Sequence, residues 1–246
     1  MSTSIPLGTI DVRYVLPSLA GEAEYATLLR KLPLDEQALA TRFLHLRDRL
    51  TFAIGRVLAR SMLSHYAAEP IGGWRFERNR YGKPAIVRDA ETPDLRFNIS
   101  HCAGAVVVAV AHEHEVGVDV ELLDEGKADC LELAREHFTA SEVDLLKGLP
   151  TAQQQRAFLA LWTLKEAYLK ARGTGLSEPL SEVSFRLNPP SIVSSATDLN
   201  RADRWFFAQE QLPSQHLLAI AAERHSEETI LYRVTQMDLA ELLEQA

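Results

Sequence analysis

The chain has 246 residues, of which 46% are hydrophobic and 24% are charged, and it carries a net charge of −8 at pH 7. These proportions are typical of a globular protein, and the length allows one large domain or two small ones. The negative charge argues against a protein that binds nucleic acid or an anionic membrane through a broad basic surface.

Several features predict a cytoplasmic protein. The longest apolar run, residues 103–111, is too short to cross a bilayer and indicates a buried strand. Residues 1–12 lack the basic segment and apolar stretch of a signal peptide. The two cysteines, Cys102 and Cys130, allow at most one disulfide, a count that fits a reducing compartment.

Helical spacing of apolar residues predicts one long helix over residues 35–66. The spaced residues are Leu39, Phe43, Leu46, Leu50, Ile54, Val57 and Met62. Short β-rich stretches then predict strands at residues 74–77, 95–100, 105–111 and 116–121.

The second part of the chain repeats this order of helices and then strands. Helices are predicted at residues 129–137, 141–147 and 151–172, and strands at 183–187, 205–209, 216–222 and 229–234. We therefore predict an α+β fold of two similar halves related by a pseudo-twofold axis, residues 1–122 and 123–246. We expect the active site at their junction, and a monomer, because one chain then supplies both sides of the site.

Two carboxylates stand two residues apart in the sequence GVDVE at residues 117–121. If this stretch is a strand, Asp119 and Glu121 point to the same side. Two adjacent acids repel each other unless a cation lies between them, so the pair is a candidate metal site. A solvated edge strand is the alternative interpretation.

The sequence WTLKEAYLK at residues 162–170 lies in the predicted helix 151–172. Glu166 and Lys170 are one helical turn apart, so they are either an ordinary surface ion pair or a metal ligand and a phosphate contact. Lys165 falls within the apolar side of this helix, where a lysine must reach solvent or find a partner. We include Lys165 with Glu166 as candidate catalytic residues.

Candidate anion-binding residues come earlier in the chain. His101, at the end of a predicted strand, could donate to a phosphate oxygen, with Asn98 and Ser100 ordering the turn. Arg78, Arg80 and Lys83 surround the turn YGKP at residues 81–84 and form a small basic cluster. A hydrogen-bonded structural histidine and a solvated basic loop are the alternatives.

Taken in order, these motifs resemble those of the 4′-phosphopantetheinyl transferases, specifically the large two-lobed type that activates surfactin synthetase and similar assembly lines. The matching segments are YGKP at 81–84, FNISH at 97–101, GVDVE at 117–121, WTLKEAYLK at 162–170 and GTGL at 173–176. The resemblance implies transfer of the phosphopantetheine arm of coenzyme A to a serine of an apo acyl or peptidyl carrier protein, with release of adenosine 3′,5′-bisphosphate.

The resemblance also implies residue roles. Asp119, Glu121 and Glu166 would hold Mg²⁺ against the pyrophosphate, and Glu166 would act on the serine proton directly or through water. His101, Lys83 and Lys170 would contact phosphates. Arg78 and residues 98–100 would complete the nucleotide pocket. The family pattern places a base before the first long helix for the adenosine 3′-phosphate, whereas here none occurs until Arg42, so Arg42, Arg47 or the 78–83 cluster are the candidates.

Two other functions remain as alternatives: a metal-dependent phosphoesterase that acts on a nucleotide, and a non-catalytic module that binds coenzyme A or a carrier protein. Retention of all three acids argues against the module, because binding alone does not require Glu166. For the carrier protein we expect an apolar docking surface within residues 122–146, including Phe138 and Leu145.

Overall fold

The computed structural model describes residues 5–17, 20–88, 92–123, 130–195, 202–225 and 228–245 of the chain, with side chains. The chain is a mixed α+β protein and divides into two compact units. The first unit contains Met1–Asn79, Pro84–His114 and Thr229–Ala246, and the second contains Arg80–Lys83 and Glu115–Glu228. None of the helices among the described residues is long and apolar enough to span a membrane.

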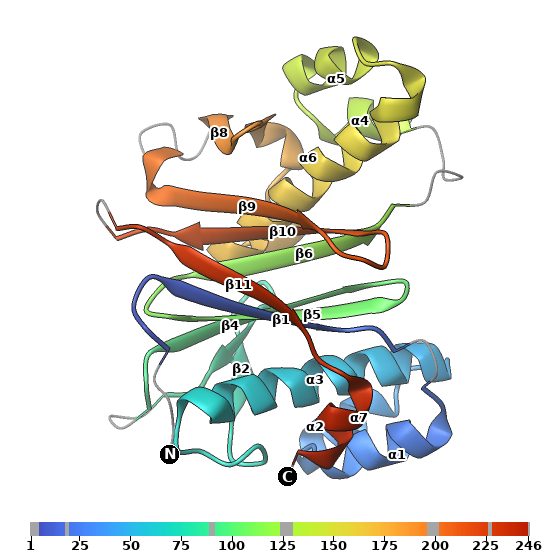
Figure 1. Ribbon diagram of the computed structural model, residues 1–246, viewed down its shortest axis with the longest axis vertical. Coiled ribbons are helices and arrows are strands. Elements are labelled where there is room, and N and C mark those ends of the chain that lie inside the picture. The colour runs from blue at the N-terminus through green and yellow to red at the C-terminus, as the bar shows by residue number, and fades with distance from the viewer. Residues whose placement is uncertain are drawn as a thin grey trace. The chain divides into compact units, whose positions relative to one another are not determined.

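The first unit is a sheet in the order β11-β1-β5-β4, covered by a layer of helices (Figure 1). The long helix α3 packs on β4 and β5, and α1, α2 and α7 pack against α3. Its elements are β1 (Thr9–Val15), α1 (Glu22–Arg30), α2 (Leu34–Ala40), α3 (Leu46–Tyr66), β2 (Phe76–Arg78), β3 (Pro84–Ile86), β4 (Leu95–Cys102), β5 (Ala105–His112), β11 (Leu231–Gln236) and α7 (Leu239–Glu244).

The second unit is a sheet in the order β6-β10-β9, and the long helix α6 packs on β6 and β10. Helices α4 and α5 pack against α6. Its elements are β6 (Val116–Leu122), α4 (Cys130–His137), α5 (Ala140–Lys147), α6 (Thr151–Arg172), the 3-10 turns η1 (Gly175–Ser177) and η2 (Leu180–Glu182), β7 (Val183–Leu187), β8 (Pro190–Ser195), η3 (Ala202–Arg204), β9 (Trp205–Gln211) and β10 (His216–Glu223).

The two units repeat one topology, which confirms the predicted pair of similar α+β halves. Each begins with a strand, continues through helices ending in a long one, forms a small hairpin, and closes with two antiparallel strands. In both sheets the first strand lies antiparallel to the last: β1 pairs with β5, and β6 pairs with β10. β11 then adds to the first sheet by parallel pairing with β1.

This grouping differs from the predicted division at residues 122 and 123 in three places: Arg80–Lys83, β6 and Thr229–Ala246. β6 opens the second unit instead of closing the first half, because its backbone pairs with β10. Thr229–Ala246 joins the first unit, because β11 pairs with β1. The predicted helix over residues 35–66 is two helices, α2 and α3, since the chain turns after Ala40 and leaves Phe43 40% exposed.

Candidate active site

The site begins where β6 touches α6 at Gly117. A Cβ atom built on Gly117 would lie 2.0 Å from the carbonyl oxygen of Ala167 and 2.4 Å from the backbone nitrogen of Ala171. A glycine is therefore required for this approach. Because strand side chains alternate, Asp119 and Glu121 share the side of β6 that faces α6.

Asp119 and Lys170 form an ion pair across this contact. Lys170 Nζ donates to Asp119 Oδ1 at 2.5 Å, and the Asp119 side chain is only 6% exposed. Val118 and Val120, on the opposite side of the strand, are fully buried. β6 is thus a packed strand, and Asp119 is not the solvated acid that the alternative interpretation requires.

Glu166, one turn before Lys170 on α6, has a carboxyl pKa raised above its usual value. Burial is the main cause, because it penalises the charged carboxylate. The positive charge of Lys170 lowers this pKa, whereas the negative charge of Asp119 raises it further. Glu166 is therefore within electrostatic reach of both residues, and the structure brings these predicted site residues of β6 and α6 together.

Glu121 lies farther along β6, at a pocket of about 200 Å³ within the second unit. The other lining residues are Leu122, Cys130, Leu133, Gln155, Phe158, Leu159 and Trp162. β6 and α6 run in opposite directions here: Gly117 meets Ala171, Asp119 meets Lys170, and Glu121 shares a pocket with Trp162. The pocket is mostly apolar, with Glu121 as its acidic side chain.

The predicted metal set of Asp119, Glu121 and Glu166 is not assembled as one cluster. Within the part of the chain that the structure describes, no three or more His, Cys, Asp and Glu side chains stand close enough to hold a metal ion. The Asp119–Glu166 pair nevertheless fits Mg²⁺, which binds hard oxygen atoms and keeps several waters beside one or two carboxylates. A cation there would relieve the repulsion that helps to raise the pKa of Glu166.

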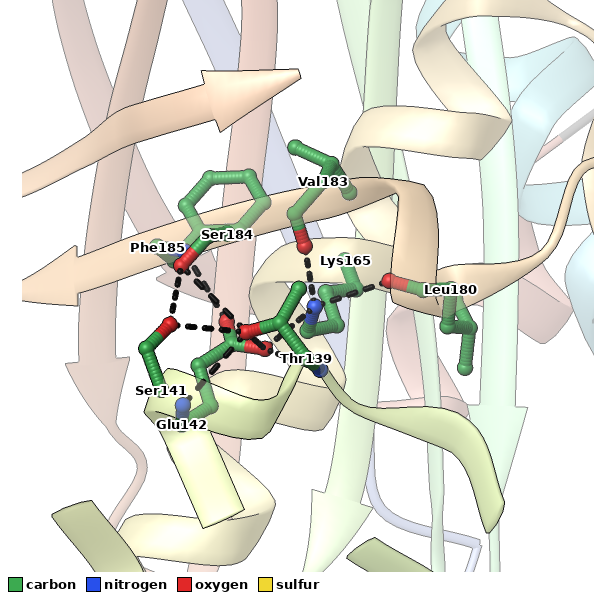
Figure 2. Close-up of polar contacts among 8 residues, drawn as sticks. All are labelled: Thr139, Ser141, Glu142, Lys165, Leu180, Val183, Ser184 and Phe185. Carbon is green, nitrogen blue, oxygen red and sulfur yellow. Dashed lines mark hydrogen bonds and ion pairs between the residues drawn. The ribbon is translucent and has the colours of Figure 1, made fainter. Parts of the chain in front are cut away.

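Lys165 does not face this site, contrary to its predicted catalytic role. Its side chain is fully buried, and Nζ forms an ion pair with Glu142 Oε2 at 2.8 Å (Figure 2). Nζ also donates to the carbonyl oxygens of Leu180 and Val183. An ammonium group has three hydrogens, so these partners use all of its donors. Burial lowers the pKa of Lys165, and the charge of Glu142 opposes that effect.

Lys83 lies in the second unit, after the turn at Gly82, whose φ of 91° favours glycine. Its Nζ lies 2.9 Å from Glu115 Oε2 and 2.9 Å from the carbonyl oxygen of Ala171, in the last turn of α6. A cation at a helix C-terminus stabilises the exposed carbonyl groups there. Lys83 therefore connects its turn to the end of the helix that carries Glu166.

The predicted nucleotide-binding residues Arg78, Asn98, Ser100 and His101 all belong to the first unit. Arg78 is the exposed last residue of β2. Asn98 and Ser100 are buried in β4, and His101 is exposed near its end, opposite Val106 of β5. The structure thus places these four side chains in the unit that does not contain β6 and α6.

The predicted docking surface within residues 122–146 needs a correction, and residues 124–129 of it lie outside the described part of the chain. Phe138 is only 5% exposed, because it packs on Phe158 and Trp162. Leu133 and Leu145 are 38% and 42% exposed. Leu133 and Leu145 are therefore the exposed large apolar side chains in the described part of this surface.

Glu142 is a residue whose role the sequence patterns do not indicate. Glu142 pairs with Lys165 and also completes a capping box with Thr139 at the start of α5. The signal was present as Thr139 followed three residues later by Glu142, a pattern that marks a helix start. This pattern predicts the helix cap, but nothing in the neighbouring sequence predicts that Glu142 pairs with Lys165.

Comparison with known proteins identifies the family. The family described as "4′-phosphopantetheinyl transferase superfamily" matches residues 115–221, and "4′-phosphopantetheinyl transferase, N-terminal" matches residues 20–114. The 4′-phosphopantetheinyl transferase HetI of Nostoc sp. is 33% identical over 201 residues, which cover 82% of each chain. The chain belongs to the 4′-phosphopantetheinyl transferase superfamily. The predicted resemblance is thereby confirmed.

Other relatives of this phosphopantetheinyl transferase agree. The 4′-phosphopantetheinyl transferase Sfp of Bacillus subtilis is 35% identical over 153 residues, 62% of this chain and 65% of Sfp. The L-aminoadipate-semialdehyde dehydrogenase-phosphopantetheinyl transferase of Pongo abelii is 27% identical over 221 residues, 84% of this chain and 72% of that protein. The two family matches meet between residues 114 and 115, where the long segment of the second compact unit, Glu115–Glu228, also begins.

Proposed function

We propose that this phosphopantetheinyl transferase moves the phosphopantetheine arm of coenzyme A to a serine of an apo acyl or peptidyl carrier protein and releases adenosine 3′,5′-bisphosphate. One observation carries the assignment of the site: a partly buried carboxyl group of raised pKa, Glu166, lies within electrostatic reach of Asp119 and Lys170. These three residues fall inside the segment that matches the superfamily.

Mg²⁺ is part of this proposal. Asp119 and Glu166 would hold it, with Glu121 as a further oxygen ligand from the same side of β6. The bound ion would offset the negative charge that develops on the diphosphate leaving group. The ion pair between Lys170 and Asp119 supports this proposal, because the charge of the Asp119 carboxylate is already balanced by a cation.

Glu166 would accept the proton of the carrier serine, directly or through one water molecule. A carboxylate acts well as a base when its pKa lies closer to the working pH, and burial moves the pKa of Glu166 in that direction. The serine oxygen would then attack the phosphorus that carries the pantetheine arm. The bond from that phosphorus to the oxygen bridging to the nucleotide would break.

Cationic side chains would bind the phosphates of coenzyme A. Lys170 could move from Asp119 to a phosphate oxygen once a metal ion neutralises the carboxylate. Lys83, His101 and Arg78, with Asn98 and Ser100, remain proposed contacts of the nucleotide. Leu133 and Leu145 are the proposed apolar contacts of the carrier protein, because they are exposed in the helices that follow β6.

Cytoplasmic location and a monomeric state also belong to the proposal. The count of two cysteines in the sequence supports the location, because it fits a reducing compartment. The internal repeat supports the monomer, because a single chain already contains both similar halves. Sedimentation or gel filtration would measure the oligomeric state.

The decisive experiment incubates the protein with coenzyme A, Mg²⁺ and an apo carrier protein, and follows the carrier by intact-mass spectrometry. Transfer adds the mass of phosphopantetheine to the carrier and releases adenosine 3′,5′-bisphosphate. Hydrolysis of coenzyme A with an unmodified carrier would favour the phosphoesterase. Binding of coenzyme A without either product would favour the non-catalytic module.

A further inference from the structure

A buried ion pair fixes α6 immediately beside Glu166. Lys165 Nζ lies 2.8 Å from Glu142 Oε2, and the two side chains are 0% and 2% exposed. Glu142 Oε1 accepts from the backbone nitrogen of Phe185 at 2.9 Å, while Oε2 accepts from that of Thr139 at 3.0 Å. The pair thus joins three segments of the second unit: α6, the start of α5, and the stretch that leads into β7 (Figure 2).

The first unit contains a second pair of the same design. Arg60 of α3 donates from Nε to Glu36 Oε2 of α2 at 2.9 Å, and these side chains are 2% and 5% exposed. Arg60 Nη1 also donates to the carbonyl oxygens of Ile71 at 3.1 Å and Trp74 at 2.7 Å. In both units, therefore, a cation on the long helix holds an acid on the preceding helix and two carbonyl groups of the chain that follows the long helix.

Such a pair is a poor source of stability by itself. Charges lose hydration on burial, and a well-packed apolar replacement of a buried ion pair is often equally stable. The pair instead fixes the long helix in place, since every hydrogen bond constrains the position and rotation of that helix. Its occurrence in both units indicates that the pair belongs to the repeated fold.

The residue that follows each cation differs between the units. Lys165 is followed by Glu166, whereas Arg60 is followed by Ser61. Consecutive side chains of a helix point about 100° apart around its axis. Fixing Lys165 toward Glu142 and Val183 therefore also fixes the direction in which Glu166 leaves the helix, on the side where Lys170, one turn later, pairs with Asp119.

We propose that Glu142 and Lys165 are positioning residues that set the direction of Glu166, and that Glu36 and Arg60 are the matching pair without an active-site neighbour. The proposal rests on the proposed function of Glu166. It explains why Lys165, although it directly precedes Glu166 in α6, is fully buried and has no access to substrate.

The test compares matched variants of the two pairs: Lys165→Met, Glu142→Gln, their double variant, and Lys165→Arg, against Arg60→Met, Glu36→Gln and their double variant. For each we would measure the thermal midpoint, kcat and KM for coenzyme A in carrier modification. Single variants in either unit should lower the midpoint by roughly 10 °C, because each leaves a buried charge unpaired.

The double variants distinguish a loss of protein stability from a displacement of Glu166. Each removes both charges of its pair, so the second-unit variant should recover most of the lost midpoint. Recovery in the first unit should be smaller, because Arg56, whose Nη1 lies 3.6 Å from Glu36 Oε1, loses that partner. The double variant of the second unit should still lose at least about tenfold in kcat, with KM for coenzyme A within about threefold, whereas that of the first unit should keep its kcat. Lys165→Arg should retain more kcat than Lys165→Met, because arginine fills the same place in the first unit. Recovery of full kcat in the second-unit double variant, or equal losses in both units, would overturn the proposal.

A second measurement does not depend on catalysis. Amide hydrogen exchange in residues 162–169 should become faster in the second-unit double variant and stay unchanged in the first-unit one. Unchanged exchange there in the second-unit variant would overturn the proposal even if the wild-type chain transferred nothing. Absence of wild-type transfer alone would instead overturn the proposed function.

Discussion

Gly117 and Ala167 are in contact through their backbones, so that a Cβ atom on Gly117 would lie 2.0 Å from the Ala167 carbonyl oxygen. This contact sets the distance between the strand that carries Asp119 and the helix that carries Glu166 and Lys170. A side chain at this position would therefore alter the site without touching any charged group.

Gly117→Ala should lower kcat/KM by about 10²-fold, because displacement of catalytic groups by about 1 Å has effects of this size. It should also destabilise the protein by roughly 1–3 kcal/mol through overpacking. Steady-state kinetics and urea unfolding would measure both. Gly148→Ala is the matched control: its Cβ would lie 3.4 Å from the nearest atom, and its φ of −74° suits alanine. A Gly117→Ala protein with the kinetics of the control would contradict the close contact.

The pKa of Glu166 should respond in opposite directions to its two charged neighbours. Asp119→Asn removes a negative charge and should lower this pKa, whereas Lys170→Met removes a positive charge and should raise it. Carboxyl-carbon NMR titration of the metal-free protein would measure both shifts. A pKa that stays constant in both variants would mean that the three residues are not electrostatically coupled.

Asp11 should contribute stability that is lost in acid. Burial alone would raise its pKa, but hydrogen bonds from Arg233 and Tyr66 and the charges of Arg13 and Arg233 outweigh burial and hold it below the usual 3.8. A lowered pKa means that this stability is present above pH 3.8 and disappears as the pH falls through the folded-state pKa.

Asp11→Asn should therefore destabilise the protein by about 1–3 kcal/mol at pH 7, and the difference from wild type should shrink as the pH falls below 3.8. Urea unfolding at several pH values would measure it. Asp144→Asn, at a carboxylate that is 75% exposed, is the control and should change stability little. If the stability difference between Asp11→Asn and wild type widened as the pH fell, a lowered pKa of Asp11 would be contradicted.

Carrier docking should depend on Leu133 and Leu145, which are 38% and 42% exposed. Leu133→Asp and Leu145→Asp should raise KM for the apo carrier by about tenfold, because they remove apolar contact area from the proposed docking surface. Val193→Asp is the control, since Val193 is 64% exposed on β8 of the same unit. Equal effects at the control and at the leucines would exclude this surface.

Local sequence patterns predict many of the helices and strands of the second unit correctly. The bounds of α6 and β7 agree with those predicted, and Gly173 ends α6 with a left-handed φ of 72°, as expected for a glycine stop. The alternation in GVDVE also correctly predicts that Asp119 and Glu121 lie on the same side of a strand. These features depend on neighbours in the sequence, which is why the sequence alone predicts them.

The remaining features depend on partners far along the chain. The strand β11 is recognisable as a strand, but nothing local shows that Arg233 lies opposite Asp11 of β1. The break after Ala40 is hidden because the apolar spacing continues through Phe43. Similarly, the pattern shows that Lys165 needs a partner but not that Glu142, on another helix, is that partner.

The rate of carrier modification by Glu166→Gln tests the central claim most directly. Fluorescent coenzyme A, an apo carrier and Mg²⁺ would be mixed with the variant, with wild type, and with Glu178→Gln, which removes an acid paired with Arg172 just beyond α6. We predict that Glu166→Gln labels the carrier at least about 10²-fold more slowly at an unchanged circular dichroism spectrum, and that EDTA abolishes wild-type labelling. Labelling by Glu166→Gln at the rate of the Glu178→Gln control would contradict a catalytic role for Glu166.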